Sequence, residues 1–368
     1  MPSSSPSHFP DSSSGAASPI APKVFIVILN WNGISDTLEC LRSLVQLTYP
    51  RWQVVVVDNG SHGDEAAVIE ANFPAITVIR NRENLGYAGG NNVGMRHAVE
   101  HSADYIWLLN NDTVVAPDSL SELIAAGRKH TDVALLSPVI YHYENPQEIQ
   151  FAGSTLEPDR EEQTTLRSVE EARVAVRARP MTLWGTALLL KRDVIDAVGY
   201  LNEQYFAYHE DLDYCLRALA VGLGIWVEPA AAVFHKTGRT LGSEDSPLKE
   251  YLLVRNWYLF WRSYLRGRRR LSYPARYMGW VLNRALNWKR AGQAARAAHA
   301  LDGAWDALHG RFGPLDSRGA MPHRLRRFLL DGLLSWHPYL WIRLLGGEPV
   351  LGEAVSRFLG RRGRGHPM

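Results

Sequence analysis

Three polar side chains that follow an apolar run have the chemistry to hold a cation or a phosphate group. The run YIWLL leads into Asn110, Asn111 and Asp112, and side chains at the C-terminal end of a strand lie where open α/β sheets bind ligands. Asp112 is the ionised oxygen ligand among them, and His235, after a short apolar stretch, is a second candidate ligand for a divalent cation. Simpler interpretations stay open, because Asn-Asp-Thr could cap a helix and a lone histidine is often structural.

Further along the chain, a second acidic cluster has the chemistry of a general base. Glu210, Asp211 and Asp213 lie at the start of a helix predicted over residues 209–221. The helix dipole favours ionised carboxylates there, which would keep a base deprotonated at neutral pH, and Asp213 can pair with Arg217. Charge complementarity with the dipole alone would also explain these acids. It does not explain the flanking aromatic side chains, which suit a sugar-binding cleft: Tyr205, Phe206, Tyr208 and Tyr214.

Polar residues also end the first two predicted strands. Asn30 and Asp58 would meet at one edge of a sheet, where a carboxylate can accept hydrogen bonds from a ribose or a nucleobase, although a turn is the simpler interpretation. The glycine-rich segment from Asn84 to Gly94 does not match the G-x-G-x-x-G pattern of dinucleotide-binding proteins. Its glycines, Gly86 among them, would let the backbone approach a diphosphate, or would serve a loop that needs positive φ before a helix.

Alternating short and long apolar patterns predict the elements that must position these residues. Short β-branched runs predict strands over residues 24–29, 53–58, 75–80, 105–110 and 133–138, with a helix between the first two. This alternation is typical of α/β folds with a doubly wound, Rossmann-like and largely parallel central sheet flanked by helices. Residues 141–180 are polar and predict loops that cover the site, whereas residues 181–199 predict a strand that enters a helix. After Pro247 the chain is all-helical and rich in Trp and Arg.

Composition and cysteine content exclude several classes of protein. Of 368 residues, 46% are hydrophobic and 21% are charged, as is ordinary for a globular protein of two or three folded units. The two cysteines, Cys40 and Cys215, lack the spacing of a thiolate metal site or a disulfide scaffold, so a reducing cytoplasm fits. Residues 1–22 predict a disordered leader rather than a secretory signal. Charged residues and a proline interrupt the apolar stretch at residues 328–345, which disfavours a simple transmembrane span.

The small net charge of +2 conceals a division between two parts of the chain. Residues 1–250 carry 19 Lys and Arg against 32 Asp and Glu, whereas residues 251–368 carry 21 against 6. Basic segments interleaved with tryptophan suit the surface of an anionic membrane, and here the tryptophans are Trp257, Trp261, Trp280 and Trp288. Nucleic acid is a less favoured partner, because no nucleic-acid motif accompanies the charge. The basic part could instead pair with the acidic part, within one chain or between two.

Seven segments, taken in chain order, resemble the successive signatures of family 2 glycosyltransferases, particularly bacterial rhamnosyltransferase-like members. The segments are VFIVILNWNG, VVVVDNGS, NLGYAGGNNVG, LLNNDT, WGTALLLKRDVIDAVG, YFAYHEDLDYCLR and FHKTG, and together they run from about Lys23 to Leu241. The resemblance implies a GT-A fold over residues 23–245, followed by a helical, basic region over residues 246–368. It also implies an inverting reaction that uses a nucleoside-diphosphate sugar and a divalent metal, Mg²⁺ or Mn²⁺.

The resemblance assigns donor and metal roles to residues at the strand ends. Asp58 and Asn30 would hold the nucleoside, and the donor site would also include Asn84, Gly86 and Asn111. The segment from Asn110 to Asp112 takes the place of the family's Asp-x-Asp motif. Because asparagine replaces the first acid of that motif, the metal would depend mainly on Asp112, aided by His235.

The resemblance also assigns the chemistry. Asp211 resembles the catalytic base that takes a proton from the acceptor hydroxyl, Glu210 would orient the acceptor, and Trp184 with Gly185 would line the donor-sugar pocket. The expected donor is dTDP-rhamnose, followed by UDP and GDP sugars. The expected acceptor is a glycan or a lipid-linked hydroxyl in cell-surface polysaccharide assembly, reached at the cytoplasmic face of an anionic membrane. No oligomeric state is predicted.

Two other functions fit parts of this pattern. A sugar nucleotidyltransferase can share the fold and the metal, but it has no need of a base at Asp211. A non-catalytic module would use its basic part to bind a membrane or nucleic acid, with the α/β part as a scaffold. An Asp211→Asn variant that keeps its turnover would favour the first, and salt-dependent binding of nucleic acid without any sugar transfer would favour the second.

Overall fold

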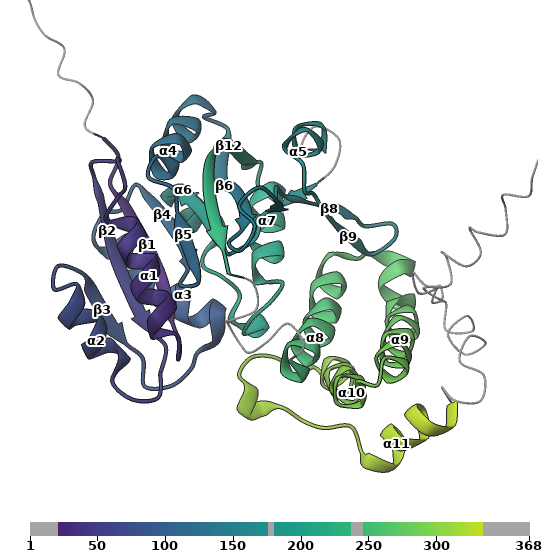
Figure 1. Cartoon of the computed structure of the whole chain (residues 1–368). Coiled ribbons are helices and arrows are strands. Elements are labelled where there is room, and N and C mark those ends of the chain that lie inside the picture. The colour runs from purple at the N-terminus through teal and green to yellow at the C-terminus, as the bar shows by residue number, and fades with distance from the viewer. Residues whose placement is uncertain (1–20, 176–179, 237–245, 334–368) are drawn as a thin grey trace, which may run out of the picture.

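The computed structural model describes residues 21–175, 180–236 and 246–333, which form an α/β layer followed by a helical region (Figure 1). The predicted leader lies outside the described residues except for residues 21 and 22, and so does the basic tail from residue 334 onward. Within the described ranges, no helix combines the length and the apolar character needed to cross a membrane.

The central sheet is built from short runs of aliphatic residues. Its strand order is β3-β2-β1-β4-β11-β6-β12-β5, with β7 paired to β6. The strands are β1 (Val24–Asn30), β2 (Trp52–Asp58), β3 (Thr77–Arg80), β4 (Tyr105–Asn110), β5 (Thr113–Val115), β6 (Val133–His142), β7 (Ile149–Phe151), β11 (Ala187–Lys191) and β12 (Gly224–His235). The strands from β3 to β4 are parallel, but β11 runs antiparallel to both β4 and β6. The sheet is therefore mixed, because the chain returns to it at the end where β4 finishes.

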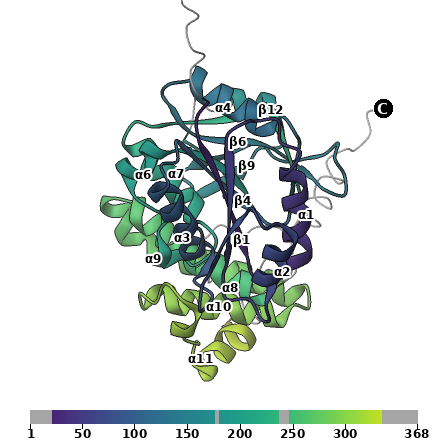
Figure 2. The same ribbon diagram turned by 90° about the vertical axis from the view of Figure 1, so that its left-hand side faces the viewer.

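Alternation along β1 explains why helices cover both faces of the sheet. Val24, Ile26 and Ile28 point to one face, where they pack with α1 (Ile34–Leu44), α2 (Glu65–Asn72) and α4 (Ser119–Lys129). Phe25 and Val27 point to the other face, where they pack with α3 (Gly86–Glu100), α6 (Arg192–Val198) and α7 (Glu210–Ala220). Figure 2 shows α1 and α2 on one side of the sheet and α3, α6 and α7 on the other. Burial of each of these side chains stabilises the fold by about 1.5–3 kcal/mol.

The glycine-rich segment forms most of α3 rather than the predicted loop. Gly90 and Gly94 lie where this helix meets β1, and an added Cβ would come within 2.4 Å of Leu29 and 2.3 Å of Val27, respectively. These glycines therefore allow the helix to pack closely on the sheet. From the sequence alone, they had been expected to let the backbone approach a diphosphate. Gly86, at the helix start, has a φ of +75°. It matches the other expectation, a positive φ before a helix.

Between residues 246 and 333 the regular elements are helices, as predicted for the chain after Pro247. The helices α8 (Pro247–Tyr264), α9 (Gly267–Arg290) and α10 (Ala294–Leu308) share an aromatic core, and α11 (His323–Arg327) follows. Two arginines of this region form ion pairs within it, Arg284 with Glu250 and Arg326 with Asp302, so part of its positive charge is neutralised internally. The tryptophans of the basic segment pack in the core or against it: Trp257, Trp261, Trp280 and Trp288.

A small antiparallel sheet replaces the loops predicted for residues 141–180. β8 (Ser154–Glu157) and β9 (Glu162–Thr165) form a hairpin, β10 (Met181–Thr182) pairs with β8, and α5 (Val169–Ala175) follows β9. The hairpin reaches toward the helical region (Figure 1), where Asp159 pairs with Arg269 and Glu161 pairs with Arg276 of α9. Single-turn helices also occur at η1 (Glu203–Tyr205), η2 (Leu315–Ser317) and η3 (Phe328–Leu333).

Candidate active site

The polar side chains at the ends of β1, β2 and β4 form a buried hydrogen-bond network. Asn30 and Asp58 are partners in the sheet register, and Asn30 Nδ2 donates to Asp58 Oδ1 at 3.0 Å. Thr37 Oγ1 donates to Asn30 Oδ1 at 2.7 Å, and Asn111 Nδ2 donates to Thr37 Oγ1 at 3.0 Å. Asp58 and Asn111 are each 7% exposed, whereas Asn30 is 0% exposed. The network brings these predicted donor residues together, with Asn30 buried behind Asp58 and bonded to it.

Asn84 and Gly86 shape the start of α3. Asn84 Oδ1 accepts a hydrogen bond from Asn59 Nδ2 at 2.9 Å and another from the Gly86 N–H at 2.8 Å. A Cβ on Gly86 would lie 2.4 Å from the backbone oxygen of Phe206, so glycine is required by space as well as by its φ. These residues hold α3 against the loop that leads into α7. Neither residue lines the pocket that contains Asp112, Asp211 and His235, and the same is true of the strand-end residues Asn30, Asp58 and Asn111.

A pocket of about 420 Å³ brings residues from distant parts of the chain together. Asp112 comes from the turn after β4, His235 from the end of β12, and Asp211 from the first turn of α7. Three other predicted residues also line the pocket: Trp184, Gly185 and Glu210. The candidate cation ligands and the candidate base therefore face one cavity.

Asp112 and His235 are in direct contact. β12 pairs with β5 so that His235 lies opposite Thr113, and His235 Nε2 is 3.3 Å from Asp112 Oδ1. The two side chains are 2% exposed for Asp112 and 11% exposed for His235. His235 Nδ1 forms a hydrogen bond with Gln150 Oε1 at 2.8 Å, and this contact turns Nε2 toward the carboxylate.

This pair fits a divalent cation. Two lone-pair acceptors at such a distance repel each other unless a proton or a cation lies between them. Among the described residues, no group of three or more His, Cys, Asp or Glu side chains is arranged to hold a metal ion. A cation here would therefore take its remaining ligands from phosphate oxygens and water, which is how one or two protein ligands commonly hold Mg²⁺.

Asp211 is held by backbone donors at the start of α7. Its Oδ2 accepts from the Gly185 N–H at 2.9 Å, and its Oδ1 accepts from the Leu212 N–H at 2.8 Å. Burial raises the pKa of Asp211, and these two N–H groups act in the opposite direction. Burial, followed by the charge of Asp211, raises the pKa of Glu210 well above its usual range. The prediction that the helix dipole sets the ionisation of both acids omitted this burial, which opposes the dipole.

The loop before α7 has a strained backbone that the helical region holds. Phe206, Tyr208 and His209 have φ values of 64°, 71° and 72°. Such left-handed conformations cost about 1–3 kcal/mol each in residues other than glycine. Asn256 of α8 is 0% exposed, and its Nδ2 donates to the carbonyl oxygens of residues 205, 207 and 208 at 2.8, 2.7 and 2.9 Å. This contact fixes the segment that presents Asp211.

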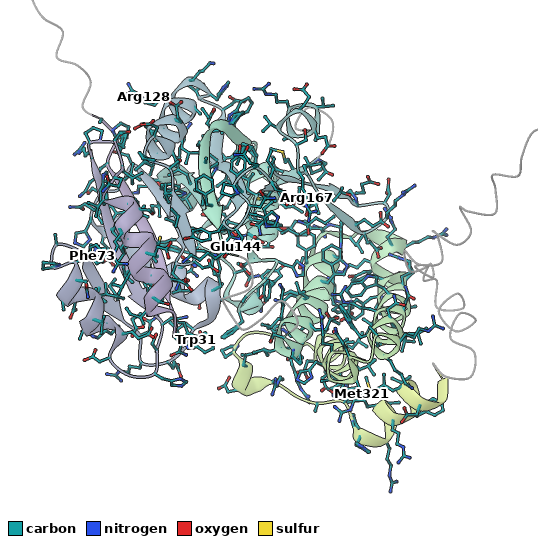
Figure 3. The ribbon with its side chains drawn as sticks, in the orientation of Figure 1. Trp31, Phe73, Arg128, Glu144, Arg167 and Met321 are labelled. Carbon is teal, nitrogen blue, oxygen red and sulfur yellow. The ribbon has the colours of Figure 1, made fainter. Side chains whose placement is uncertain are left out.

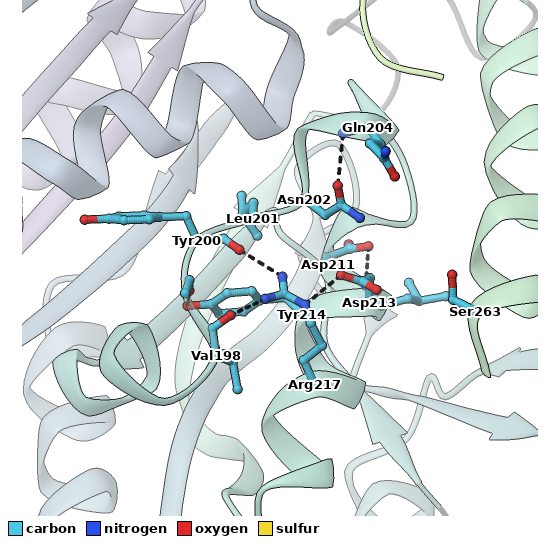
Figure 4. Close-up of polar contacts among 12 residues, drawn as sticks. Val198, Tyr200, Leu201, Asn202, Gln204, Asp211, Asp213, Tyr214, Arg217 and Ser263 are labelled. Atoms are coloured by element: carbon cyan, nitrogen blue, oxygen red, sulfur yellow. Dashed lines mark hydrogen bonds and ion pairs between the residues drawn. The ribbon is translucent and has the colours of Figure 1, made fainter. Parts of the chain in front are cut away.

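Arg217 anchors the helix that carries the candidate base. As predicted, it pairs with Asp213, with 2.8 Å between Arg217 Nε and Asp213 Oδ2. Its other nitrogens donate to the carbonyl oxygens of Val198 and Tyr200 (Figure 4). Tyr264 Oη of α8 donates to Asp213 Oδ1 at 3.0 Å. The predicted ion pair is therefore structural, since it ties α7 to the end of α6 and to α8.

The pocket also contains residues that were not among the predicted site residues, including Tyr87, Gln150, Arg167 and Lys249. Tyr87 Oη donates to Gly185 O at 2.6 Å, so it supports the backbone that bonds to Asp211. Arg167, labelled in Figure 3, and Lys249 bring positive charge to the pocket. Tyr87 lies in a segment that carried the resemblance, which was a usable signal. The other three reach the pocket from β7, from the chain after β9 and from α8, whose packing has no local signal.

The α/β part and the full chain are similar to known glycosyltransferases. Residues 25–196 match the model of the family described as Glycosyl transferase family 2. The low-salt glycan biosynthesis hexosyltransferase Agl10 of Haloferax volcanii is 24% identical over 314 residues, which cover 82% of this chain and 93% of Agl10. The galactofuranosyltransferase GlfT1 of Mycolicibacterium smegmatis is 26% identical over 186 residues, which cover 50% of this chain and 61% of GlfT1.

Two solved structures share the fold. The structure of GalNAc-T7 with UDP, GalNAc and Mn²⁺ has a TM-score of 0.54 at 15% identity, over 79% of this chain and 57% of that one. S. aureus TarS 1-349 has a TM-score of 0.50 at 15% identity, over 94% of this chain and 93% of that one. The predicted fold class is confirmed as GT-A-like α/β, with a mixed central sheet and flanking helices. The family model matches residues 25–196, and the two related proteins are glycosyltransferases by name.

Proposed function

We propose that this protein is an inverting glycosyltransferase that moves a sugar from a nucleoside diphosphate to a hydroxyl of a glycan or lipid-linked acceptor. The observation that carries the proposal is the convergence of Asp112, His235 and Asp211 on one pocket. A cation site and a base on the same cavity are what direct displacement at an anomeric carbon requires. The names of Agl10 and GlfT1, a hexosyltransferase and a galactofuranosyltransferase, support transfer of a sugar.

The donor is proposed to extend from the strand ends into the pocket. Asp58 would accept hydrogen bonds from the nucleoside, while Asn30, Asn84, Gly86 and Asn111 keep this end of the site in shape. Trp184, which stacks on Phe151 with ring centroids 4.2 Å apart, would wall the donor-sugar pocket together with Gly185. The positive charges that line the pocket, Arg167 and Lys249, would favour the diphosphate.

Asp211 would be the base of the transfer step. It would take the proton of the acceptor hydroxyl as that oxygen forms a bond to the anomeric carbon, and the bond from this carbon to the diphosphate oxygen would break. The nucleoside diphosphate would leave with the electron pair of the broken bond. Attack opposite to the leaving group inverts the anomeric configuration without a covalent enzyme intermediate. Glu210, which lines the same pocket, would orient the acceptor.

Asp112 and His235 are proposed to hold Mg²⁺ or Mn²⁺ beside the diphosphate. When bound, the cation would supply charge stabilisation for the departing diphosphate. Gln150 would keep the imidazole of His235 turned with Nε2 toward the site. Mn²⁺ is present in the structure of GalNAc-T7, whose fold this chain shares, so it is the first cation to use in a binding experiment.

The donor is proposed to be dTDP-rhamnose, on the resemblance to rhamnosyltransferase-like members of the family. Thermal unfolding with dTDP, UDP and GDP, each with and without Mn²⁺, tests this proposal and the cation site together. A nucleotide at about one hundred times its dissociation constant stabilises the folded state by about 2.7 kcal/mol. We expect dTDP with Mn²⁺ to give the largest shift and Asp112→Asn to remove the effect of Mn²⁺. A protein that responds to none of the nucleotides would contradict the proposal.

We also propose that the start of α9 meets an anionic membrane surface. Arg266, Arg268 and Arg270 are exposed there, and Leu271 is 82% exposed. Positive charges at a helix N-terminus oppose the helix dipole, so helix stability does not explain them. Each basic residue near an anionic surface contributes about 1 kcal/mol to binding. A variant that combines Arg268→Gln, Arg270→Gln and Leu271→Ser should co-sediment less with phosphatidylglycerol vesicles. Unchanged binding would refute the proposal that this surface meets a membrane.

A further inference from the structure

A second cleft, of about 360 Å³, opens beside the catalytic pocket. Gln163, His209 and Leu253 line both cavities, so the two adjoin. The remaining lining residues come from the β8–β9 hairpin and from α8 and α9: Glu161, Glu162, Trp257, Trp280 and Arg284. The donor and the transfer step described above leave this cleft without a role.

Two tryptophans form an aromatic surface in the cleft. The rings of Trp257 and Trp280 are stacked, with centroids 6.3 Å apart and an angle of 29° between their planes. The ring of His209 lies 5.1 Å from that of Trp257. Both tryptophans are half-buried, pack against the helical core and line the cleft, and the Arg284 guanidinium lies 5.5 Å from the centroid of the Trp280 ring. A large aromatic face with polar groups nearby suits a ligand that has one apolar face and several hydroxyls.

The polar groups of the cleft favour an uncharged ligand. His209 Nδ1 is buried without a hydrogen-bond partner among the described residues. Burial, followed by the charge of Arg284, lowers the pKa of His209 to about 3, so its ring is neutral at physiological pH and can bond to a hydroxyl. Among the described residues that line the cleft, Arg284 is the only cation, and its Nη2 donates to Glu250 Oε2 at 2.8 Å. A phosphate group would find no cation here that is not already paired.

We propose that this cleft is an acceptor subsite, in which an uncharged pyranose of the acceptor glycan stacks on Trp257 and Trp280. The inference rests on the proposed transfer reaction, because the acceptor hydroxyl must approach Asp211 from the adjoining pocket. The sugar that reacts lies in the catalytic pocket, and the next sugar of the glycan passes His209 into the cleft. The enzyme therefore recognises at least two sugars of its acceptor, which makes a disaccharide a better acceptor than a monosaccharide.

Binding of neutral sugars tests this subsite without the natural acceptor. The probes are methyl glycosides of hexopyranoses and of their disaccharides, measured by saturation-transfer NMR and by calorimetric titration. The variants are Trp257→Ala and Trp280→Ala, with Trp305→Ala as the control, because Trp305 is a half-buried tryptophan of α10 whose ring lies 4.1 Å from that of His309, outside the cleft. We expect at least one disaccharide to bind the unaltered protein and to lose about tenfold in affinity in the two cleft variants, about 1.4 kcal/mol. The control should bind as the unaltered protein does.

Nucleotide binding separates this inference from the proposed function. All three variants should keep the thermal shift with nucleoside diphosphate and Mn²⁺, because the cleft lies outside the donor site. Trp257→Phe and Trp280→Phe, which keep more of the core packing, provide the same comparison if the alanine variants unfold. Equal sugar affinity in cleft and control variants would overturn the subsite, as would a panel in which no glycoside binds. Loss of binding to phosphatidylglycerol vesicles in the cleft variants, with sugar binding intact, would also overturn it.

Discussion

The two halves of the candidate site differ in how completely their polar atoms are satisfied. At the strand ends, Asn30, Asp58 and Asn111 belong to one hydrogen-bond network. In the adjoining pocket, Glu210 Oε2 and His209 Nδ1 are buried and have no hydrogen-bond partner among the described residues. Leaving such an atom unsatisfied costs about 1–3 kcal/mol. Folding therefore satisfies the strand-end network, whereas it leaves these two atoms of the pocket without a partner among the described residues.

The largest expected effect belongs to the pocket half. Asp211→Asn removes the proton acceptor but nearly preserves side-chain volume, so we expect transfer to fall by about 10²- to 10⁴-fold with little change in nucleotide binding. The rate of sugar transfer and the thermal shift with nucleotide measure the two quantities. Asp196→Asn, an exposed acid of α6, is the matched control. Full turnover in Asp211→Asn would instead favour a nucleotidyltransferase.

The next effect tests the strand-end half. Asn30→Ala leaves the partners of its amide, Asp58 and Thr37, with fewer hydrogen bonds in a buried place, so we expect a loss of about 2–3 kcal/mol in the free energy of unfolding. Urea unfolding measures this loss. Asn72→Ala is the control, because Asn72 lies on the exposed surface of α2. Equal stability of the two variants would mean that the network does not support the fold.

A smaller effect is expected at the proposed cation site, which lies in the pocket half. Gln150→Ala releases Nδ1 of the His235 ring, and loss of such a partner typically weakens metal affinity by about 10- to 100-fold. Titration of Mn²⁺ in the presence of nucleoside diphosphate measures this change, with Gln204→Ala, an exposed residue, as the control. Nucleotide binding in the absence of metal should not change. Mn²⁺ affinity equal to that of the control would argue against His235 as a ligand.

The smallest effect concerns stability and pH. Because burial raises the pKa of Glu210 in the folded state, the stability that this raised pKa contributes is present at low pH and is lost as the pH rises through the folded pKa. Glu210→Gln keeps a neutral group at every pH, so it should gain about 1 kcal/mol over the unaltered protein at about pH 8. The gain should shrink toward about pH 5, as thermal unfolding at both pH values would show. A gain that is larger at the lower pH would contradict the stated ionisation.

Local patterns in the sequence predicted strands at β1–β4, β6 and β11, but not at β5 or β7–β10. Apolar runs placed Asp112 at the end of a strand and Asp211 at the start of a helix, and in an α/β sheet these positions meet at one edge. The rest depends on contacts between segments far apart in the chain. Arg269 of α9 holds the hairpin at Asp159, and Lys249 reaches the pocket from α8. The burial of Glu210 likewise depends on tertiary contacts. A prediction based on the helix dipole alone therefore missed the raised pKa of this residue.

Asn256 of the helical region donates hydrogen bonds to the loop with left-handed backbone angles. The helical region therefore cannot be replaced by that of another protein without affecting this loop. An α/β layer expressed alone, or fused to the helices of another protein, would keep its strand-end hydrogen-bond network but would release residues 206–209 to relaxed backbone angles. The carboxylate of Asp211 would then lose its fixed orientation in the pocket. In a chimaeric protein, Asn256 and the loop to which it donates hydrogen bonds must therefore come from the same parent.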